Sequence, residues 1–313
     1  MTVAFTFPGQ GSQAVGMGKA LAEQFPAAKA VFDEVDSALS QKLSQIMWEG
    51  PQETLTLTEN AQPALMAVSV AVVKVLEAEA GLDLARDVKF VAGHSLGEYS
   101  ALAAAGTFSI SDAAKLLKIR GQAMQKAVPV GTGAMAALLG VELEAARALA
   151  AEAAQGEVCD VANDNGGGQV VVSGNKAAVE RAAEIAKGKS IRAMMLPVSA
   201  PFHCALMQPA ADAMRDALSK VQVNAPKVPV VANVTASAVT DPQEIVDLLV
   251  RQVTGTVRWR ECVQYLAANG VTKIVEAGSG KVLTGLLKRI AKEVSGQPVG
   301  SPEDVAAYKA ANA

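Results

Sequence analysis

Short apolar runs alternate with longer amphipathic stretches along the first 127 residues of the chain. Two of the apolar runs, at 3–7 and 89–92, are predicted strands, because each is short and the first is stopped by the turn signal Pro8-Gly9. The stretches with helical spacing lie at 16–26, 27–47, 63–76, 98–105 and 111–127. This alternation of strand and helix favours an α/β fold with a parallel sheet.

Two helix starts are predicted from single residues. Pro63 is tolerated in a first helical turn, where its missing N–H would have no partner in any case. Ser111 is expected to cap the helix at 111–127, because a serine oxygen accepts hydrogen bonds from the amides of a first turn.

The order of elements changes after Pro129. From there to residue 198 the pattern predicts strand, helix, strand, strand, helix and strand, at 134–141, 142–155, 158–163, 169–174, 176–187 and 192–198. This βαββαβ order is typical of the ferredoxin-like fold. We therefore expect a ferredoxin-like small subdomain at 129–198, inserted into a large α/β subdomain made of 1–128 and 199–313.

Helices and short strands return in the last part of the chain, at 204–219, 228–232, 242–253, 273–276 and 281–292. The residues that follow include Gly296, Pro298, Gly300 and Pro302. Because glycine and proline interrupt regular structure, we expect a loosely held tail there.

Composition narrows the classes of function. Half of the residues (50%) are hydrophobic, so a substantial core can be buried. Lys and Arg number 28 against 31 Asp and Glu, and without a basic excess a dedicated nucleic-acid binder is not expected. The cysteines at 159, 204 and 262 form no C-x-x-C pair, so neither a disulfide framework nor a zinc ribbon is expected, and a reducing cytoplasm fits.

The sequence predicts no membrane segment. The first basic residue is Lys19, so the N-terminus lacks the charged region of a signal peptide. The most apolar stretch, 61–76, contains Gln62, Ser69 and Lys74, and it falls short of the roughly 18 apolar residues that span a bilayer.

The stretch Gly93-His-Ser-Leu-Gly97 fits the G-x-S-x-G pattern of a serine nucleophile. It follows a predicted strand and precedes a predicted helix, which is the context that this pattern requires. The glycines allow a sharp turn, and the helix N-terminus presents amides to an oxyanion. The alternative is a chance match in a loop rich in small residues, but the strand–turn–helix context favours Ser95 as the nucleophile.

A serine nucleophile needs a base, and the chain has 2 histidines, His94 and His203. His94 precedes Ser95 on the same tight turn, where its ring is poorly placed to reach the Ser95 oxygen. We therefore expect His203 to be the base, the alternative being a partly buried ring held by backbone groups. The usual serine–acid–histidine order of α/β-hydrolases does not fit this chain, so a backbone carbonyl is the alternative to a carboxylate for orienting the imidazole.

Arg120 lies on an apolar stripe of the predicted helix 111–127, together with Ala113, Leu117 and Met124. An arginine in such a stripe either extends its head to the surface or is buried against an anion. A guanidinium binds a carboxylate through two parallel hydrogen bonds, which a lysine cannot do. The pattern alone leaves both possibilities open.

Several motifs occur in a fixed order from Val3 to Ile290: 7–13, 62–64, 93–101, 120–121, 131–135, 201–204, 251–252 and 280–283. Together they resemble the malonyl-CoA:acyl-carrier-protein transacylases of type II fatty acid synthesis. One stretch departs from the family, since Gly278-Ser-Gly-Lys281 stands where the family has Gly-Pro-Gly-Lys. The resemblance implies an α/β-hydrolase-like large subdomain with a ferredoxin-like insertion.

The resemblance also implies roles for individual residues. Ser95 would be the nucleophile and His203 its base, with the main-chain carbonyl of Gln252 orienting the ring. The amides of Gln10 and Leu96 would form the oxyanion hole. The residues implied for substrate binding are Arg120, which would hold the malonyl carboxylate, and Asn163, Asn165 and Met124.

The implied reaction is a ping-pong transfer of malonyl from malonyl-CoA, through malonyl-serine, to the phosphopantetheine thiol of acyl carrier protein. It needs no metal and no bound cofactor. The expected partners are acyl carrier protein and coenzyme A, with no nucleic acid and no membrane, and the chain is expected to be a cytoplasmic monomer. The alternatives are an acyltransferase of a polyketide pathway, a serine thioesterase or esterase, and a non-catalytic module that binds carrier protein.

Overall fold

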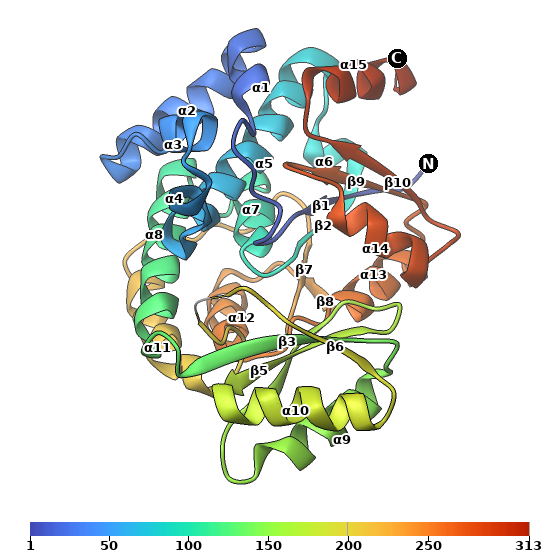
Figure 1. The fold of residues 1–313 in the computed structure, drawn as a ribbon. Coiled ribbons are helices and arrows are strands. Elements are labelled where there is room, and N and C mark those ends of the chain that lie inside the picture. The colour runs from blue at the N-terminus through green and yellow to red at the C-terminus, as the bar shows by residue number, and fades with distance from the viewer. Residues whose placement is uncertain (199, 313) are drawn as a thin grey trace.

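A six-stranded sheet forms the centre of the larger part of the computed structural model, which describes residues 1–198 and 200–312 (Figure 1). Ser199, where the large subdomain was expected to resume, and Ala313 lie outside the described residues. The strand order is β10-β9-β1-β2-β7-β8, and β8 alone among these strands runs antiparallel to its neighbour. The strands are β1 (Val3–Phe7), β2 (Val88–Gly93), β7 (Val230–Ala232), β8 (Ser237–Val239), β9 (Lys273–Ala277) and β10 (Ser295–Val299).

Helices cover both faces of this sheet. Alternate residues of the central strands enter two different apolar cores: Phe5 packs with the helices of one face, whereas Ala4 packs with those of the other. Two covered faces explain why the strands read as nearly continuous apolar runs. The first core receives α1 (Lys19–Gln24), α2 (Pro26–Leu39), α3 (Leu43–Glu49), α4 (Gln52–Thr56), α5 (Thr58–Ala80), α7 (Gly97–Ala104), α8 (Ile110–Lys126), α11 (Gln208–Leu218), α12 (Pro242–Thr254) and α15 (Pro302–Ala311), and the second receives α13 (Trp259–Ala268) and α14 (Val282–Ile290).

The helix α5 runs through the middle of the first core. Among the described helices it is the one with the length and hydropathy to cross a membrane, but 83% of its most apolar window is buried inside the protein. Such burial is typical of a core helix. Pro63 lies inside α5, which begins at Thr58, so the prediction that Pro63 opens this helix was wrong.

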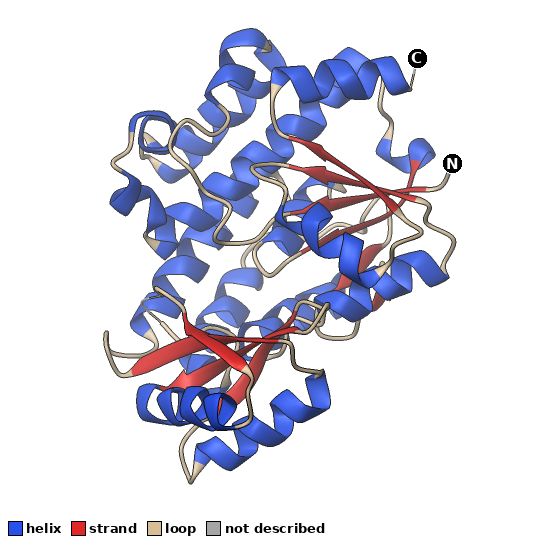
Figure 2. Cartoon of the chain, turned by 45° about the vertical axis from the view of Figure 1, so that its right-hand side comes forward, coloured by secondary structure: helices blue, strands red, loops and turns tan. Residues whose placement is uncertain are grey.

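A separate four-stranded antiparallel sheet carries the order β4-β5-β3-β6. It is built from β3 (Gly133–Leu139), α9 (Leu143–Ala154), β4 (Cys159–Asp164), β5 (Gln169–Asn175), α10 (Lys176–Gly188) and β6 (Arg192–Met195). Both helices lie on the face turned away from the larger sheet and share a small apolar core with the strands (Figure 2). This confirms the predicted α/β fold with a ferredoxin-like insertion.

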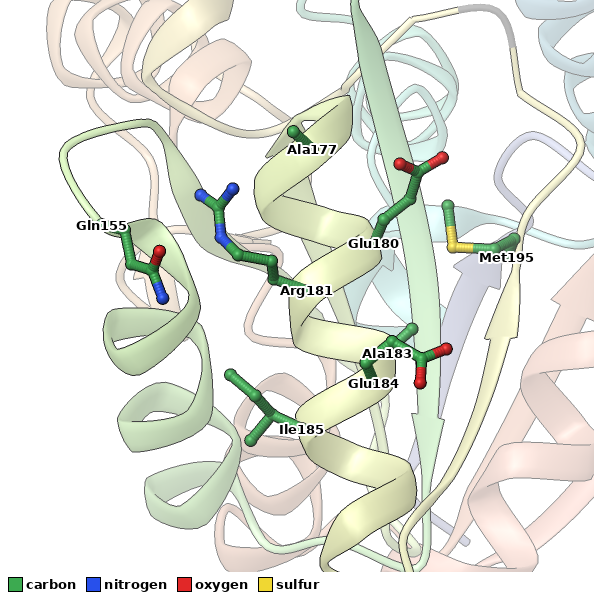
Figure 3. Close-up of a pocket in the computed structure, with 8 residues that line it drawn as sticks. All are labelled: Gln155, Ala177, Glu180, Arg181, Ala183, Glu184, Ile185 and Met195. Atoms are coloured by element: carbon green, nitrogen blue, oxygen red, sulfur yellow. The ribbon is translucent and has the colours of Figure 1, made fainter.

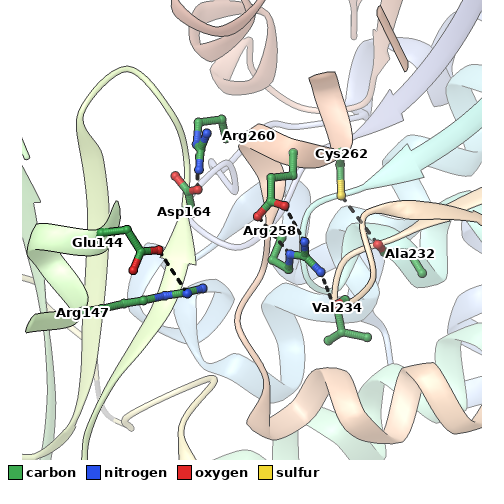
Figure 4. A network of polar contacts seen from close by, with 9 residues as sticks. Glu144, Arg147, Asp164, Ala232, Val234, Arg258, Arg260 and Cys262 are labelled. Carbon is green, nitrogen blue, oxygen red and sulfur yellow. Dashed lines mark hydrogen bonds and ion pairs between the residues drawn. The ribbon is translucent and has the colours of Figure 1, made fainter. Parts of the chain in front are cut away.

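The end of β4 is joined to the larger part by backbone and side-chain contacts. Val257 donates to the carbonyl of Ala162 at 2.8 Å and accepts from the amide of Asp164 at 3.0 Å. The Asp164 carboxylate accepts from Arg260 Nε at 2.8 Å, and Figure 4 shows this pair reaching from β4 to α13. The inserted sheet is therefore held in place next to the carboxyl end of the larger sheet.

The predicted loose tail was wrong. The residues 295–299 form β10, which pairs in parallel with β9, and Pro302 opens α15. Pro298 is accommodated because β10 is an edge strand, where a missing N–H leaves no ladder bond unmade. Ser301 and Asp304 form a capping box, and Val305 and Tyr308 are buried.

Two predicted helix boundaries also differ from the structure. The cap of α8 is Ser109, whose oxygen accepts from the amide of Asp112, and Ser111 instead contacts Glu34. The stretch 27–47 is divided into α2 and α3, because Ser40 takes a left-handed conformation at the end of α2. Neither difference moves a candidate site residue.

Candidate functional site

Ser95 lies at the carboxyl end of β2, on the tight turn that leads into α7. Its φ is 54°, a left-handed conformation that is strained for a residue other than glycine. The flanking glycines permit the turn: a Cβ on Gly93 would lie 1.9 Å from the backbone of Gly97, and one on Gly97 would lie 2.3 Å from the carbonyl oxygen of Phe7. The turn therefore lifts the Ser95 side chain out of the strand, as the motif predicts.

His203 is the imidazole that meets this serine. Its Nε2 lies 2.7 Å from Ser95 Oγ, and its Nδ1 lies 2.9 Å from the main-chain carbonyl of Gln252. A carbonyl only accepts, so Nδ1 carries the proton and Nε2 is free to accept from the serine hydroxyl. Burial, with the positive charge of Arg120 adding to it, lowers the pKa of His203 to about 3, which keeps the ring neutral at neutral pH.

His94 points elsewhere. Its Nε2 lies 2.9 Å from Asn165 Oδ1, and its ring packs at 5.7 Å from the ring of Trp259. The geometry therefore agrees with the expectation, drawn from the sequence, that His94 is not the base.

Arg120 is 1% exposed, so the alternative of a side chain that extends to the surface is wrong. Its Nη1 donates to Gln62 Oε1 at 2.8 Å, and its Nη2 donates to Gln252 Oε1 at 2.9 Å and to Ser95 Oγ at 3.2 Å. Within the described residues, its Nε has no partner and no carboxylate forms an ion pair with it. A buried guanidinium held by neutral groups can bind an anion.

A cavity of about 370 Å³ joins these groups and lies between the two sheets. Its lining comes from both parts of the molecule: Gln10, Gly11, Gln13, Thr56, Gln62, His94, Ser95, Arg120, Met124, Met135, Asn163, Leu196, Pro197, Val198, Phe202 and His203. The lining includes the serine, the imidazole and the guanidinium, and residues 196–198 add apolar side chains to it. A small acyl group with one negative end fits this distribution.

Two amides next to Ser95 are free to donate. The loops after β1 and β2 are neighbours, because Phe7 is in register with Gly93 on adjacent parallel strands. Neither the amide of Gln10 nor that of Leu96 donates to an acceptor in the described part of the chain. Amides placed in this way can stabilise negative charge that develops near the serine oxygen.

The remaining predicted substrate residues separate into two groups. Asn163 and Met124 line the cavity, and Met124 Sδ accepts from Gln62 Nε2 at 3.6 Å. Asn165 does not line it and reaches it only through the hydrogen bond with His94. Asn163 therefore lines the cavity directly, whereas Asn165 lies behind His94.

The side chain of Gln252 takes part in more contacts than the sequence analysis expected. Its Nε2 donates to the Ser95 carbonyl, to Glu98 Oε2 and to Asn233 Oδ1, while its Oε1 accepts from Arg120. Asn233 also accepts from the amide of Ser95 at 2.8 Å. Glu98 and Asn233 were missed, although Asn233 directly follows a predicted strand at the edge where Ser95 lies, and Gln62 was noted only as a motif residue.

Cys204, the residue after His203, does not line this cavity. Its Sγ is buried and donates to the carbonyl of Pro201 at 3.1 Å, and burial raises the pKa of the thiol to about 11. Across the described residues, no group of three or more His, Cys, Asp and Glu side chains is arranged to hold a metal ion.

Comparison with known proteins adds an independent finding. A family model described as an acyl transferase domain matches residues 4–307. The malonyl CoA-acyl carrier protein transacylase of Bacillus subtilis strain 168 is 46% identical over 305 residues, 97% of this chain and 95% of that protein. The crystal structure of the acyl-carrier-protein S-malonyltransferase from Bartonella henselae is 58% identical, with a TM-score of 0.97 over 100% of this chain and 99% of that one.

A further solved structure contains a partner. It holds a malonyl-transacylase in complex with its type II PKS acyl-carrier protein, and the transacylase is 41% identical, with a TM-score of 0.96 over 100% of both chains. These similarities extend over both sheets of the present structure.

Proposed function

The chain belongs to the acyl transferase family, and from this membership we propose that it transfers malonyl from malonyl-CoA to the phosphopantetheine thiol of an acyl carrier protein. The observation that carries the proposal is the 2.7 Å contact between Ser95 Oγ and His203 Nε2 beside a buried Arg120 that has no carboxylate partner in the part of the chain that the structure describes. The product would supply fatty acid synthesis. Acyl transfer needs the pair of Ser95 and His203, and selection of an acyl group with a free carboxylate needs the guanidinium of Arg120.

In the first half-reaction, Ser95 Oγ attacks the thioester carbonyl carbon while His203 Nε2 accepts the hydroxyl proton. The carbonyl oxygen becomes negative and is stabilised by the amides of Gln10 and Leu96. The C–S bond then breaks, and His203 returns the proton to the coenzyme A sulfur. The Gln252 carbonyl holds the imidazolium in position through Nδ1.

The second half-reaction reverses these roles. The thiol of the carrier's phosphopantetheine gives its proton to His203 and attacks the malonyl-serine carbonyl, and Ser95 leaves with the proton restored. A thioester is already activated, so positioning and the exclusion of water are the main requirements, and neither a metal nor a bound cofactor enters the proposed steps.

The proposal includes the remaining expectations from the sequence. Arg120 binds the malonyl carboxylate, with Asn163, Asn165 and Met124 shaping the substrate site. The chain acts as a cytoplasmic monomer, and its subdomains divide at 1–128, 129–198 and 199–313.

Mass spectrometry of the intact protein after brief exposure to malonyl-CoA, without acceptor, tests the proposal. We expect one malonyl adduct on the wild type, none on Ser95→Ala, and a slower adduct on His203→Ala. A stoichiometric adduct on Ser95→Ala would refute the assignment of the nucleophile. A burst of free malonate in place of a stable adduct would favour the thioesterase alternative.

A second arm separates the pathways. The malonyl-enzyme is offered a carrier protein of fatty acid synthesis and one of polyketide synthesis, and the two transfer rates are compared. Faster transfer to the fatty acid carrier is the expected result. Faster transfer to the polyketide carrier would support the alternative, for which the similarity to a transacylase solved with a type II PKS carrier is the supporting observation.

A further inference from the structure

Glu98 is a buried carboxyl group that the proposed steps do not use. It lies in the first turn of α7, three residues after Ser95, and is 2% exposed. Its Oε2 accepts from Gln252 Nε2 and from the amide of Asn233, both at 2.9 Å. Within the described residues no basic side chain forms an ion pair with it. A carboxyl in this position needs a physical reason, because an unpaired charge is costly to bury.

The side-chain amide of Gln252 connects Glu98 to the guanidinium of Arg120. The Gln252 side chain donates to Glu98 and accepts from Arg120, so its dipole is oriented between the carboxyl and the guanidinium. Arg120 and Glu98 are therefore two buried groups of opposite charge separated by a single side chain. An acyl carboxylate bound to Arg120 would be a second anion that competes for the same positive charge.

We propose that Glu98 is the internal counter-charge of Arg120, and that its protonation state sets how strongly the cavity prefers an acyl group with a free carboxylate. This inference rests on the proposed function and adds a group that acts on specificity through Gln252 and Arg120. Glu98 is thus a positioning residue, since nothing places it against the substrate.

Burial fits this role, because it raises the pKa of Glu98 to about 7. Below that pH the carboxyl is neutral, and the charge of Arg120 is fully available to a substrate carboxylate. Above it the carboxyl is ionised, offsets part of that charge and repels a second anion. The preference for malonyl over acetyl should therefore be higher on the acid side of pH 7 and lower on the alkaline side.

Other titratable groups nearby do not change charge in this range. The elements packed against α7 are α5, α8, β1, β2 and β7, and Arg120 is the one charged residue on them that interacts electrostatically with Glu98 in the described chain. Tyr99 on α7 and Cys262 on α13 also interact with it, and burial raises the pKa of both. Burial lowers the pKa of His203, so this ring stays neutral.

The test measures kcat/KM for malonyl-CoA and for acetyl-CoA from well below to well above pH 7, in the wild type and in Glu98→Gln. We expect the malonyl-to-acetyl ratio of the wild type to fall roughly tenfold across this range, because one buried charge appears near the bound carboxylate. Glu98→Gln keeps an oxygen that accepts from Gln252 and Asn233, and its ratio should stay at the high plateau at every pH.

Glu276→Gln is a matched control. Glu276 is also fully buried in β9, and burial raises its pKa, but its carboxylate accepts from the amides of Leu283 and Thr284. This variant should retain the pH profile of the wild type. A wild-type ratio that does not change with pH, or a Glu98→Gln ratio that falls as the wild type does, overturns the inference.

A second measurement does not depend on the folding of Glu98→Gln. Binding of malonyl-CoA to Ser95→Ala is followed by calorimetry near pH 7 in two buffers of different ionisation enthalpy. By linkage, a bound carboxylate should favour the neutral form of Glu98. The protein should therefore take up protons when malonyl-CoA binds, and it should not do so when acetyl-CoA binds. Equal proton uptake with both ligands overturns the inference. If the wild type forms no malonyl adduct, the proposed function fails and this inference fails with it, whereas a normal adduct with a flat ratio refutes Glu98 alone.

Discussion

A groove along α10 and the Ser95 cavity differ in how far their polar groups already have partners. The groove along α10 has a volume of about 610 Å³ and is lined by Arg181, Glu180 and Glu184 among others (Figure 3). The Ser95 cavity is smaller, about 370 Å³. In the groove, Arg181 is already bonded to the carboxylate of Glu157 and to the carbonyls of Ala153 and Ala154.

In the Ser95 cavity, by contrast, several polar groups have no partner among the described residues. Across the part of the chain that the structure describes, its buried guanidinium has no anionic partner and two nearby amides donate to no acceptor. Its serine and histidine both have left-handed backbones, with φ of 54° and 59°. Polar groups without partners therefore identify the site, whereas volume alone selects the groove. The following predictions test this contrast, beginning with the largest expected effect.

Arg120→Ala should lower malonyl transfer while acetyl transfer is retained or increased. A charged hydrogen-bond pair of this kind is worth about 1.5–3 kcal/mol, which corresponds to roughly ten- to more than hundredfold in the ratio of the two kcat/KM values. Arg120→Lys should recover part of the preference, because an ammonium cannot bind a carboxylate through two parallel bonds. If Arg120→Ala depresses both transfers equally, Arg120 is a structural residue.

Asp164→Asn should have an intermediate effect. It removes the anionic partner of Arg260 from a carboxylate that is 2% exposed, and charged hydrogen bonds contribute about 1.5–3 kcal/mol. We expect a decrease of this size in the free energy of unfolding, measured with denaturant. We also expect a lower kcat/KM, since Asn163 and Asn165 flank this residue. An unchanged stability would mean that this ion pair does not contribute to holding the subdomains together.

Arg181→Gln should have the smallest effect. The side chain of Arg181 is 31% exposed and its partner Glu157 is 38% exposed, so solvent screens the pair and the expected change in stability is below about 1 kcal/mol. The malonyl and acetyl kcat/KM values should equal those of the wild type in the same assay. A clear loss of transfer activity would show that the groove along α10 takes part in function and that the contrast drawn above is wrong.

The sequence predicted those parts of the site that depend on local chain geometry. The strand, turn and helix around Ser95 could be read from residues 90–105. Of the two histidines in the sequence, His94 was excluded by its place on the turn, so His203 remained as the base. The partners of Arg120 could not be read in this way, because Gln62 and Gln252 come from helices distant in sequence. An apolar stripe shows which side chains share a face of a helix. It does not show whether a long side chain on that face, such as Arg120, is buried along its whole length.

The loose tail illustrates a second limit. Glycine and proline at 296–302 suggested irregular structure, yet these residues form an edge strand and open a helix. A first helical turn tolerates Pro302, and an edge strand tolerates Pro298, but only the sheet order shows that β10 is an edge strand. Glu98 was missed for a related reason, since a glutamate in a first helical turn is common and only the folded contacts reveal that this one is buried.

The place of β1 in the sheet has a consequence for how the chain is made. β1 lies between β2 and β9 and is separated from β9 by most of the sequence, so one of its two edges stays without a partner until residues 273–277 have left the ribosome. An unpaired strand edge invites contact with other chains. Gln252 and β9 lie close together in the sequence, so the contacts around Ser95 and the second edge of β1 are completed at almost the same stage of synthesis.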